Sequence, residues 1–257
     1  MISAQFYQLR KQRVLPIAFA GLVLLMTAIA VLAAGIDSEE QKTASYLFAE
    51  GAFSSMTMFS FMFMAGAVGT VCCGDFPDKT INYELMSGSS RDQVYFGRAV
   101  AALVTAVPAG LFMELISLGL CALILGWGDS IGPGAAVLRV LMTVFPYIRI
   151  CCFYIMVSFI VKNTGLVIIT AFALLQGISL LIGDSSRAPD LSLALLCCRS
   201  FLRTESFITF ELDGRERMVF DTSLSPGGAA AAVLVSLLAA AAYIFIGRTY
   251  FDKDDLR

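Results

Sequence analysis

The feature that most constrains this chain is a series of six apolar runs, each long enough to cross a lipid bilayer. A helix needs about 20 apolar residues to span a hydrocarbon core about 30 Å thick. Only 15% of the 257 residues are charged and 58% are hydrophobic, whereas soluble domains usually carry about 25% charged residues. We therefore expect an all-α membrane protein with six transmembrane helices. The expected spans are residues 14–36, 51–73, 99–125, 135–161, 165–182 and 227–247.

The segment before the first run predicts an amphipathic helix on the inner membrane surface, over residues 1–13. Ile2, Phe6 and Leu9 share one helical face, with two arginines beside it, which is the pattern of an interfacial helix. A frayed basic tail is the alternative. This basic segment together with the first apolar run also looks like a signal peptide. The run is about 22 residues long, however, whereas the apolar region of a signal peptide has about 7–15 residues. A retained helix is therefore expected.

Basic residues predict the orientation of the chain. Lys and Arg gather at the N-terminal segment, in the loops after the second and fourth runs, and after the sixth run. The intervening loops carry more Asp and Glu than Lys and Arg. Short loops rich in Lys and Arg stay in the cytoplasm, so we expect both termini to be cytoplasmic.

The longest loop, residues 183–226, falls on the extracytoplasmic side. Residues 191–202 are apolar enough for a short re-entrant or interfacial helix. Two strand-like runs then flank Asp213 and Gly214, and an Asp-Gly pair in this setting is a strong hairpin signal. We expect a small extracellular β-hairpin there.

The cytoplasmic segment between the second and third runs, residues 78–90, predicts a short helix followed by the start of a longer one. Asp78 can cap the short helix, and Gly88 can end it in the left-handed conformation. Ser90 and Gln93 have the spacing of a capping box for the next helix, which continues into the membrane. Three apolar side chains of the short helix then face the cytoplasm at helical spacing: Ile81, Leu85 and Met86.

One set of residues in this segment follows a known pattern: Thr80–Ile81, Leu85, Ser87–Gly88, Ser90–Arg91, Tyr95 and Gly97–Arg98. In these residues the chain resembles the coupling-helix segment of ABC-2 type permeases, the membrane subunits of ATP-driven exporters. Two positions depart from the family pattern, with Lys79 in place of Gly and Arg98 in place of Lys. A looser likeness extends over the whole chain, through the surface helix, the six spans and the long loop before the last span.

The resemblance implies a type V exporter-like topology and a set of partners. Such a permease pairs with a second copy, as a homodimer or close heterodimer, and with two ATPase subunits that bind ATP and Mg. The short single-domain form is similar to bacterial exporters of lantibiotics, bacitracin and phenol-soluble modulins, so the implied cargo is an amphipathic, antimicrobial or toxin peptide crossing the bacterial cytoplasmic membrane. The implied coupling residues are Lys79, Thr80, Ile81, Leu85, Met86, Gly88, Ser90 and Arg91.

No ATPase is expected within the chain itself. Residues 74–80 superficially resemble a phosphate loop but lack its second glycine, and no strand precedes them. We therefore expect a transport subunit that is not an enzyme and holds no cofactor of its own. Without histidine or a C-x-x-C pair no metal site is expected, and the near-neutral charge gives no sign of nucleic-acid binding.

Two ionisable residues lie deep within apolar runs, where such groups are costly. Glu114 falls near the middle of the third run and Arg149 near the middle of the fourth. Antiparallel neighbours would place them at similar depth, so we expect an ion pair, which could position the helices or act as a substrate contact or gate. Pro108 and Pro146 are expected to kink the same two helices.

The second run is rich in Met and Phe, which can adapt to varied apolar partners. The resemblance implies that the first, second and fifth helices line a central cavity across a dimer; lipid contact or helix packing explains the Met and Phe equally well. The candidate cavity residues are Met56, Thr57, Ser60 and Gln176.

Other functions remain open. A gradient-driven secondary transporter would favour inverted repeats and paired intramembrane carboxylates, and only Glu114 is such a carboxylate. An ABC-2 permease for a drug, a lipid-linked molecule or an ion is a further alternative. An intramembrane protease of the CAAX type is disfavoured, because Glu39–Glu40 lacks the expected downstream arginine and the chain has no histidine.

Overall fold

The structure is a computed structural model. It describes residues 13–36, 43–74, 76, 86–88, 90–170, 173, 207–212, 215–220 and 226–253.

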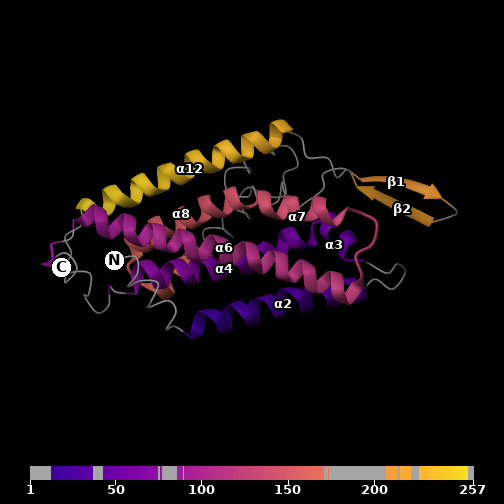
Figure 1. The fold of residues 1–257 in the computed structure, drawn as a ribbon, viewed down its shortest axis with the longest axis horizontal. Coiled ribbons are helices and arrows are strands. Elements are labelled where there is room, and N and C mark those ends of the chain that lie inside the picture. The colour runs from indigo at the N-terminus through magenta and orange to yellow at the C-terminus, as the bar shows by residue number, and fades with distance from the viewer. Residues whose placement is uncertain are drawn as a thin grey trace.

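Within these residues, five helical stretches are long and apolar enough to cross a membrane. The long helices run lengthwise beside one another (Figure 1), which is the arrangement of a multi-pass membrane protein. The stretches are Val14–Gly35, Met56–Cys73, Arg91–Leu125, Pro133–Val161 and Gly227–Lys253.

The first expected span is a helix at the expected bounds, α2 (Val14–Ile36). The second is α4 (Ala52–Cys73), but a short helix that the sequence did not predict, α3 (Ala44–Glu50), comes just before it. Gly51 separates the two helices with φ +90°, a left-handed conformation that glycine adopts without a steric penalty. The segment expected to be an outer loop is therefore partly helical, and most of α3 is buried.

The third span belongs to α6 (Arg91–Leu125), an unbroken helix of 35 residues that runs on through Pro108. The fourth is divided into α7 (Pro133–Met142) and α8 (Val144–Val161), with Thr143 between them. Pro146 has no N–H to donate to the carbonyl four residues earlier, which is that of Met142 at the end of α7. In the fourth span, the kink expected at Pro146 is therefore a break between two helices, α7 and α8.

Several expectations fall outside the described residues. They are the surface helix over residues 1–13, except for its last residue, most of the fifth span after residue 170, the helix over residues 191–202, and most of the segment 78–90. Residues 164–170, which include the start of the fifth span, are helical.

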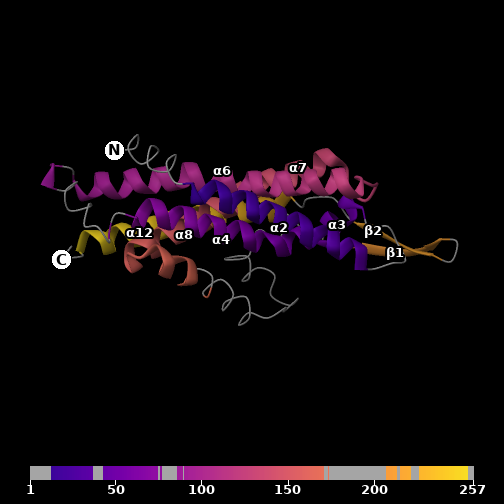
Figure 2. The same cartoon turned by 90° about the horizontal axis from the view of Figure 1, so that it is seen from below.

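Two strands and a long helix complete the described chain. β1 (Phe207–Leu212) pairs antiparallel with β2 (Arg215–Phe220), with Leu212 opposite Arg215, at the positions where the sequence predicts a hairpin. α12 (Pro226–Lys253) follows. The strands lie at the end of the bundle opposite to the C-terminal end of α12 (Figures 1 and 2).

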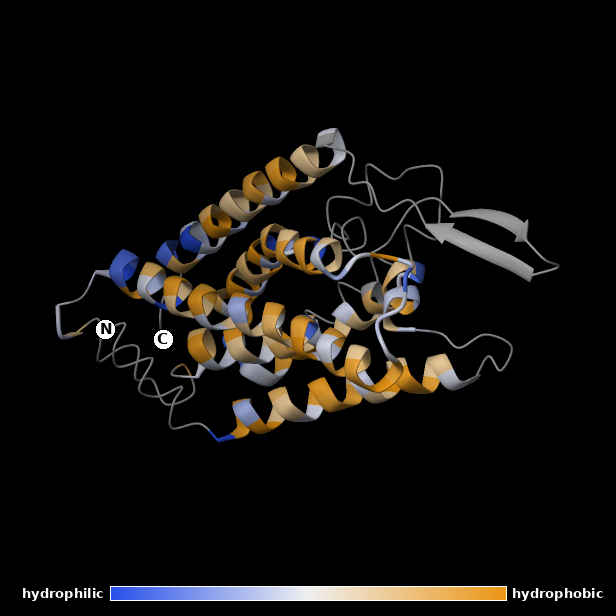
Figure 3. Cartoon of the chain, turned by 45° about the vertical axis from the view of Figure 1, so that its right-hand side comes forward, coloured by the Kyte–Doolittle hydropathy of each residue, from blue (hydrophilic) through white to orange (hydrophobic). Residues whose placement is uncertain are grey.

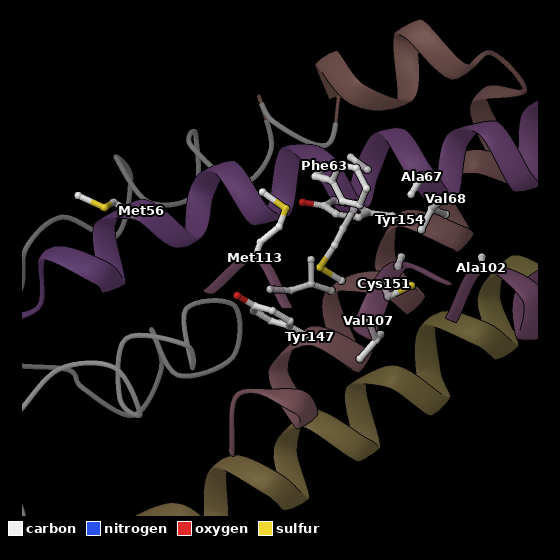
Figure 4. Close-up of a cluster of buried hydrophobic side chains, with 14 of the residues drawn as sticks. Met56, Phe63, Ala67, Val68, Ala102, Val107, Met113, Tyr147, Cys151 and Tyr154 are labelled. Carbon is white, nitrogen blue, oxygen red and sulfur yellow. The ribbon is translucent and has the colours of Figure 1, made fainter. Parts of the chain in front are cut away.

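The core is centred on α4. Of its membrane-spanning stretch 67% is buried inside the chain, against 17% for α12, so α12 presents most of its surface outward. Figure 4 shows Phe63 and Val68 of α4 grouped with Met113 of α6 and with Tyr147 and Tyr154 of α8. Hydrophobic residues dominate the middle of the bundle, and hydrophilic residues gather at the start of α6 and the end of α12 (Figure 3).

Candidate functional site at the start of α6

The start of α6 is fixed by the predicted capping box. Ser90 is extended, with φ −71° and ψ 153°, and its Oγ accepts a hydrogen bond from the Gln93 backbone N–H at 3.2 Å. The Gln93 Oε1 accepts one in return from the Ser90 backbone N–H at 3.1 Å. Two backbone donors that would otherwise lack a partner at the helix start are thus satisfied. The prediction from the Ser90–Gln93 spacing is confirmed.

The turn before the capping box has the predicted left-handed glycine. Gly88 has φ +95°, and a β-carbon added to it would meet no heavy atom within 4 Å. The backbone conformation, and not a close contact, therefore favours glycine there. Met86, two residues earlier, is helical and 82% exposed. The other expected coupling residues of the short helix, Lys79, Thr80, Ile81 and Leu85, lie outside the described residues.

The first turn of α6 is tied to the last turn of α12. The Arg91 guanidinium donates to the backbone carbonyls of Phe251 at 3.2 Å and Asp252 at 2.9 Å, two acceptors that a helix C-terminus leaves without intrahelical partners. The resemblance implies that Arg91 takes part in coupling; in this structure its guanidinium contacts α12.

An exposed ion pair adds to this contact. Asp92 accepts two hydrogen bonds from Arg248, at 2.8 and 2.9 Å, in the two-point geometry that suits guanidinium and carboxylate. Asp92 also lies in the first turn of α6, where the helix dipole favours negative charge. Because both side chains are about half exposed, solvent weakens the pair, and it fixes orientation more than it adds stability.

One turn further along α6, an aromatic cluster forms the buried part of the contact. The Tyr95 hydroxyl donates to the Ile244 carbonyl at 2.9 Å. Its ring lies 4.6 Å from that of Phe159 and 6.2 Å from that of Phe251, centroid to centroid. The cluster therefore joins α6, α8 and α12; together with the contacts of Arg91 and Asp92 we call it the α6–α12 junction.

The junction also includes α4. The Arg98 side chain is fully buried, and its Nη1 donates to the Cys72 carbonyl at 3.3 Å near the end of α4. Tyr95 and Arg98 belong to the sequence motif, so the motif marks residues at the centre of the junction. Their partners on α12 and α4 carry no comparable signal, because no short-range pattern tells which helices will be neighbours.

A second polar group lies inside the bundle, around Glu114. Its Oε1 accepts hydrogen bonds from the Ser60 hydroxyl at 2.8 Å and the Tyr147 hydroxyl at 3.1 Å. All three side chains are buried, and they come from α6, α4 and α8. Figure 4 shows the Tyr147 ring among the buried side chains of this region.

The expected ion pair between Glu114 and Arg149 is not among the contacts of the described residues. Arg149 is buried on α8, but it lies two residues after Tyr147, and two residues correspond to a rotation of about 200° around a helix. The face of α8 that brings Tyr147 to Glu114 therefore turns Arg149 away. Both side chains are buried, but the sequence could not determine which face of its helix each would occupy.

The three described cavity candidates, Met56, Thr57 and Ser60, are buried within this single chain. Ser60 serves the interior polar group and does not face an open cleft. Gln176 lies outside the described residues.

Comparison with known proteins gives this chain no family. No protein-family model matches it, and no curated protein matches it. The likeness to ABC-2 permeases therefore rests on the residues of the segment 79–98 and on the order of the spans.

Proposed function

We propose that this chain is the membrane subunit of an ABC exporter and that a separate ATPase docks at the start of α6. The observation that carries the proposal is the exposed side chain of Met86, beside the left-handed Gly88 and the capped start of α6. Methionine is enriched in protein–protein interfaces and adapts to the shape of a partner. An exposed methionine attached to a rigid helix start suits a docking contact.

The length of α6 supports a mechanical role. Its 35 residues correspond to about 52 Å, which exceeds the hydrocarbon core of about 30 Å. The first turns therefore extend beyond the membrane while the rest crosses it. A displacement of the capped first turn passes directly into the span, because α6 runs unbroken from Arg91 to Leu125.

The α6–α12 junction extends that displacement to other helices. Arg91, Asp92 and Tyr95 hold the end of α12, and Arg98 holds the end of α4. Rigid movement of packed helices is a common way to convert a local contact into a change across a whole protein. In this account, ATP binding in the partner moves these helix ends together.

The proposed assembly has six spans in each permease, a second permease copy as homodimer or close heterodimer, and two ATPase subunits carrying ATP and Mg. Both termini and the segment 78–90 face the cytoplasm of a bacterium, and the β1–β2 hairpin faces outward. The cargo is an amphipathic, antimicrobial or toxin peptide. These features follow from the resemblance and the charge distribution, and the end-to-end separation of the hairpin and the α6–α12 junction fits them (Figure 1).

Co-purification tests the proposal. A tagged chain isolated from its native membranes should bring down an ATP-binding subunit, quantified by mass spectrometry. Met86→Asp should lower the recovered subunit at least tenfold, because a buried interface contact is replaced by a desolvated charge. A tenfold loss corresponds to about 1.4 kcal/mol of binding free energy. Met86→Leu should retain the subunit.

The matched control is Lys253→Gln, at the exposed end of α12. It makes the net charge more negative by one, as Met86→Asp does, but lies outside the proposed docking segment. Equal recovery of the ATPase with wild type and Met86→Asp would contradict docking at this turn. Absence of any ATP-binding subunit from the wild-type preparation would contradict the class of protein.

A gradient-driven transporter is the second candidate, favoured by the buried carboxyl of Glu114. Vesicles containing this chain alone distinguish the two, because only the second candidate moves cargo without an ATPase.

A further inference from the structure

Glu114 is held in an unusual setting for a carboxyl group. It lies eleven residues before the end of α6, about 16 Å along the helix axis, inside the bundle and 1% exposed. Both of its hydrogen bonds reach the same oxygen, since Ser60 and Tyr147 each donate to Oε1. The other oxygen, Oε2, is buried without a hydrogen-bond partner in the described part of the chain.

Within the described residues, no Lys or Arg side chain is bonded to this second oxygen. α2 and α4 contain no Lys, Arg, Asp or Glu. α7 and α8 contain one arginine each, Arg139 and Arg149, and both take part in interactions of their own. The remaining charges of α6, among them Arg98, lie at least sixteen residues away toward its start, about 24 Å along the axis.

Among the residues that the structure describes, an ionised carboxylate in this position would be a buried charge with no counter-ion at its second oxygen. Such a charge is strongly disfavoured, and a group that can take up a proton does so instead. We propose that Glu114 is a proton-binding site: it takes one proton from the aqueous phase and is held as a neutral carboxylic acid at neutral pH. This goes beyond the proposed function and does not depend on it.

The hydrogen bonds indicate which oxygen holds the proton. Ser60 and Tyr147 both donate to Oε1, which therefore acts as the carbonyl oxygen, and the proton lies on Oε2. The neutral group joins α4, α6 and α8 through two hydrogen bonds without requiring a cation. The deletion of one donor should remove one of the two hydrogen bonds to the carbonyl oxygen and leave the proton in place.

Infrared difference spectroscopy of the purified full chain in lipid nanodiscs at pH 7 tests this assignment. Subtraction of the Glu114→Gln spectrum from that of wild type should leave a carboxylic-acid C=O band. Ser60→Ala and Tyr147→Phe should each shift that band to higher frequency, because each removes a hydrogen bond to the carbonyl. The matched control is Glu50→Gln, an exposed position, which should leave the carboxylic-acid band unchanged.

Three results would overturn the proposal that Glu114 holds a proton. A Glu114→Gln difference spectrum that contains carboxylate bands and no carboxylic-acid band would overturn the proposal. So would failure of Glu114→Gln to fold, because a neutral amide of the same size should replace a neutral acid but not a charge that balances a cation. A band that Ser60→Ala and Tyr147→Phe both leave unmoved would also contradict the assignment of the proton to Oε2.

Discussion

Gly247 determines how closely α12 approaches the rest of the bundle. A β-carbon at this position would lie 2.6 Å from the Tyr95 hydroxyl and 3.2 Å from the Met156 α-carbon. The second atom belongs to the backbone of α8, so it can move only if the helix moves. The hydrogen bond from Tyr95 to the Ile244 carbonyl therefore depends on the absence of a side chain at residue 247.

Gly247→Ala should lower the free energy of unfolding by about 1–3 kcal/mol, the usual cost of adding a methyl group to a packed site. A denaturant titration of the purified chain measures this. The control is Gly119→Ala in α6, where nothing lies within 4 Å of the added carbon and where alanine favours the helix by up to about 1 kcal/mol. Equal stability of the two variants would show that the α6–α12 junction is looser than the structure describes.

At the scale of elements, local sequence determines where α6 begins. It does not reveal the break at Gly51 that separates α3 from α4. The Ser90–Gln93 box acts within one turn, so its spacing alone predicts where the helix begins. Gly51 lies at the edge of a long apolar run, and the short helix before it is held by contacts with distant residues. Backbone N–H groups of Ala44 and Ser45 donate to the carbonyls of Gly126 and Trp127, beyond the end of α6.

Ser90→Ala should free the first turn of α6. Loss of an N-cap costs about 1 kcal/mol, which corresponds to a roughly fivefold increase in the population of the frayed turn. Amide hydrogen exchange at Gln93 and Val94, whose N–H groups are bonded to Ser90, should accelerate by at least that factor, while exchange in the middle of α6 stays unchanged. Ser90→Asp is the control, because an aspartate caps a helix as well as serine does, and it should exchange like wild type.

At the scale of the whole molecule, the sequence predicts the spans better than it predicts their contacts. The helices α2, α6 and α12 each contain an expected span, and α4 contains all but the first residue of another, because hydropathy depends only on the local sequence. The interior group at Glu114 and the α6–α12 junction could not be predicted in full. Each depends on which helix faces are neighbours, and residues as far apart as Asp92 and Arg248 become partners only in the folded bundle.

The outward-facing apolar residues of the bundle include a group along α12 and one residue, Met86, before the start of α6. α12 presents most of its apolar length outward, as expected for a helix in contact with lipid or with a second permease, whereas Met86 lies beyond the polar start of α6. Two exposed apolar side chains near the same end of the bundle, Met86 and Tyr250, should thus have different neighbours. The proposed function assigns the ATPase to the first and not to the second.

Site-specific photocrosslinking in native membranes tests that central claim most directly. A photoreactive amino acid at position 86 should form a covalent adduct with an ATP-binding subunit, and the same probe at position 250 should not. An adduct of position 86 with lipid alone, or equal adducts with an ATPase from both positions, would contradict docking of a motor subunit at the start of α6.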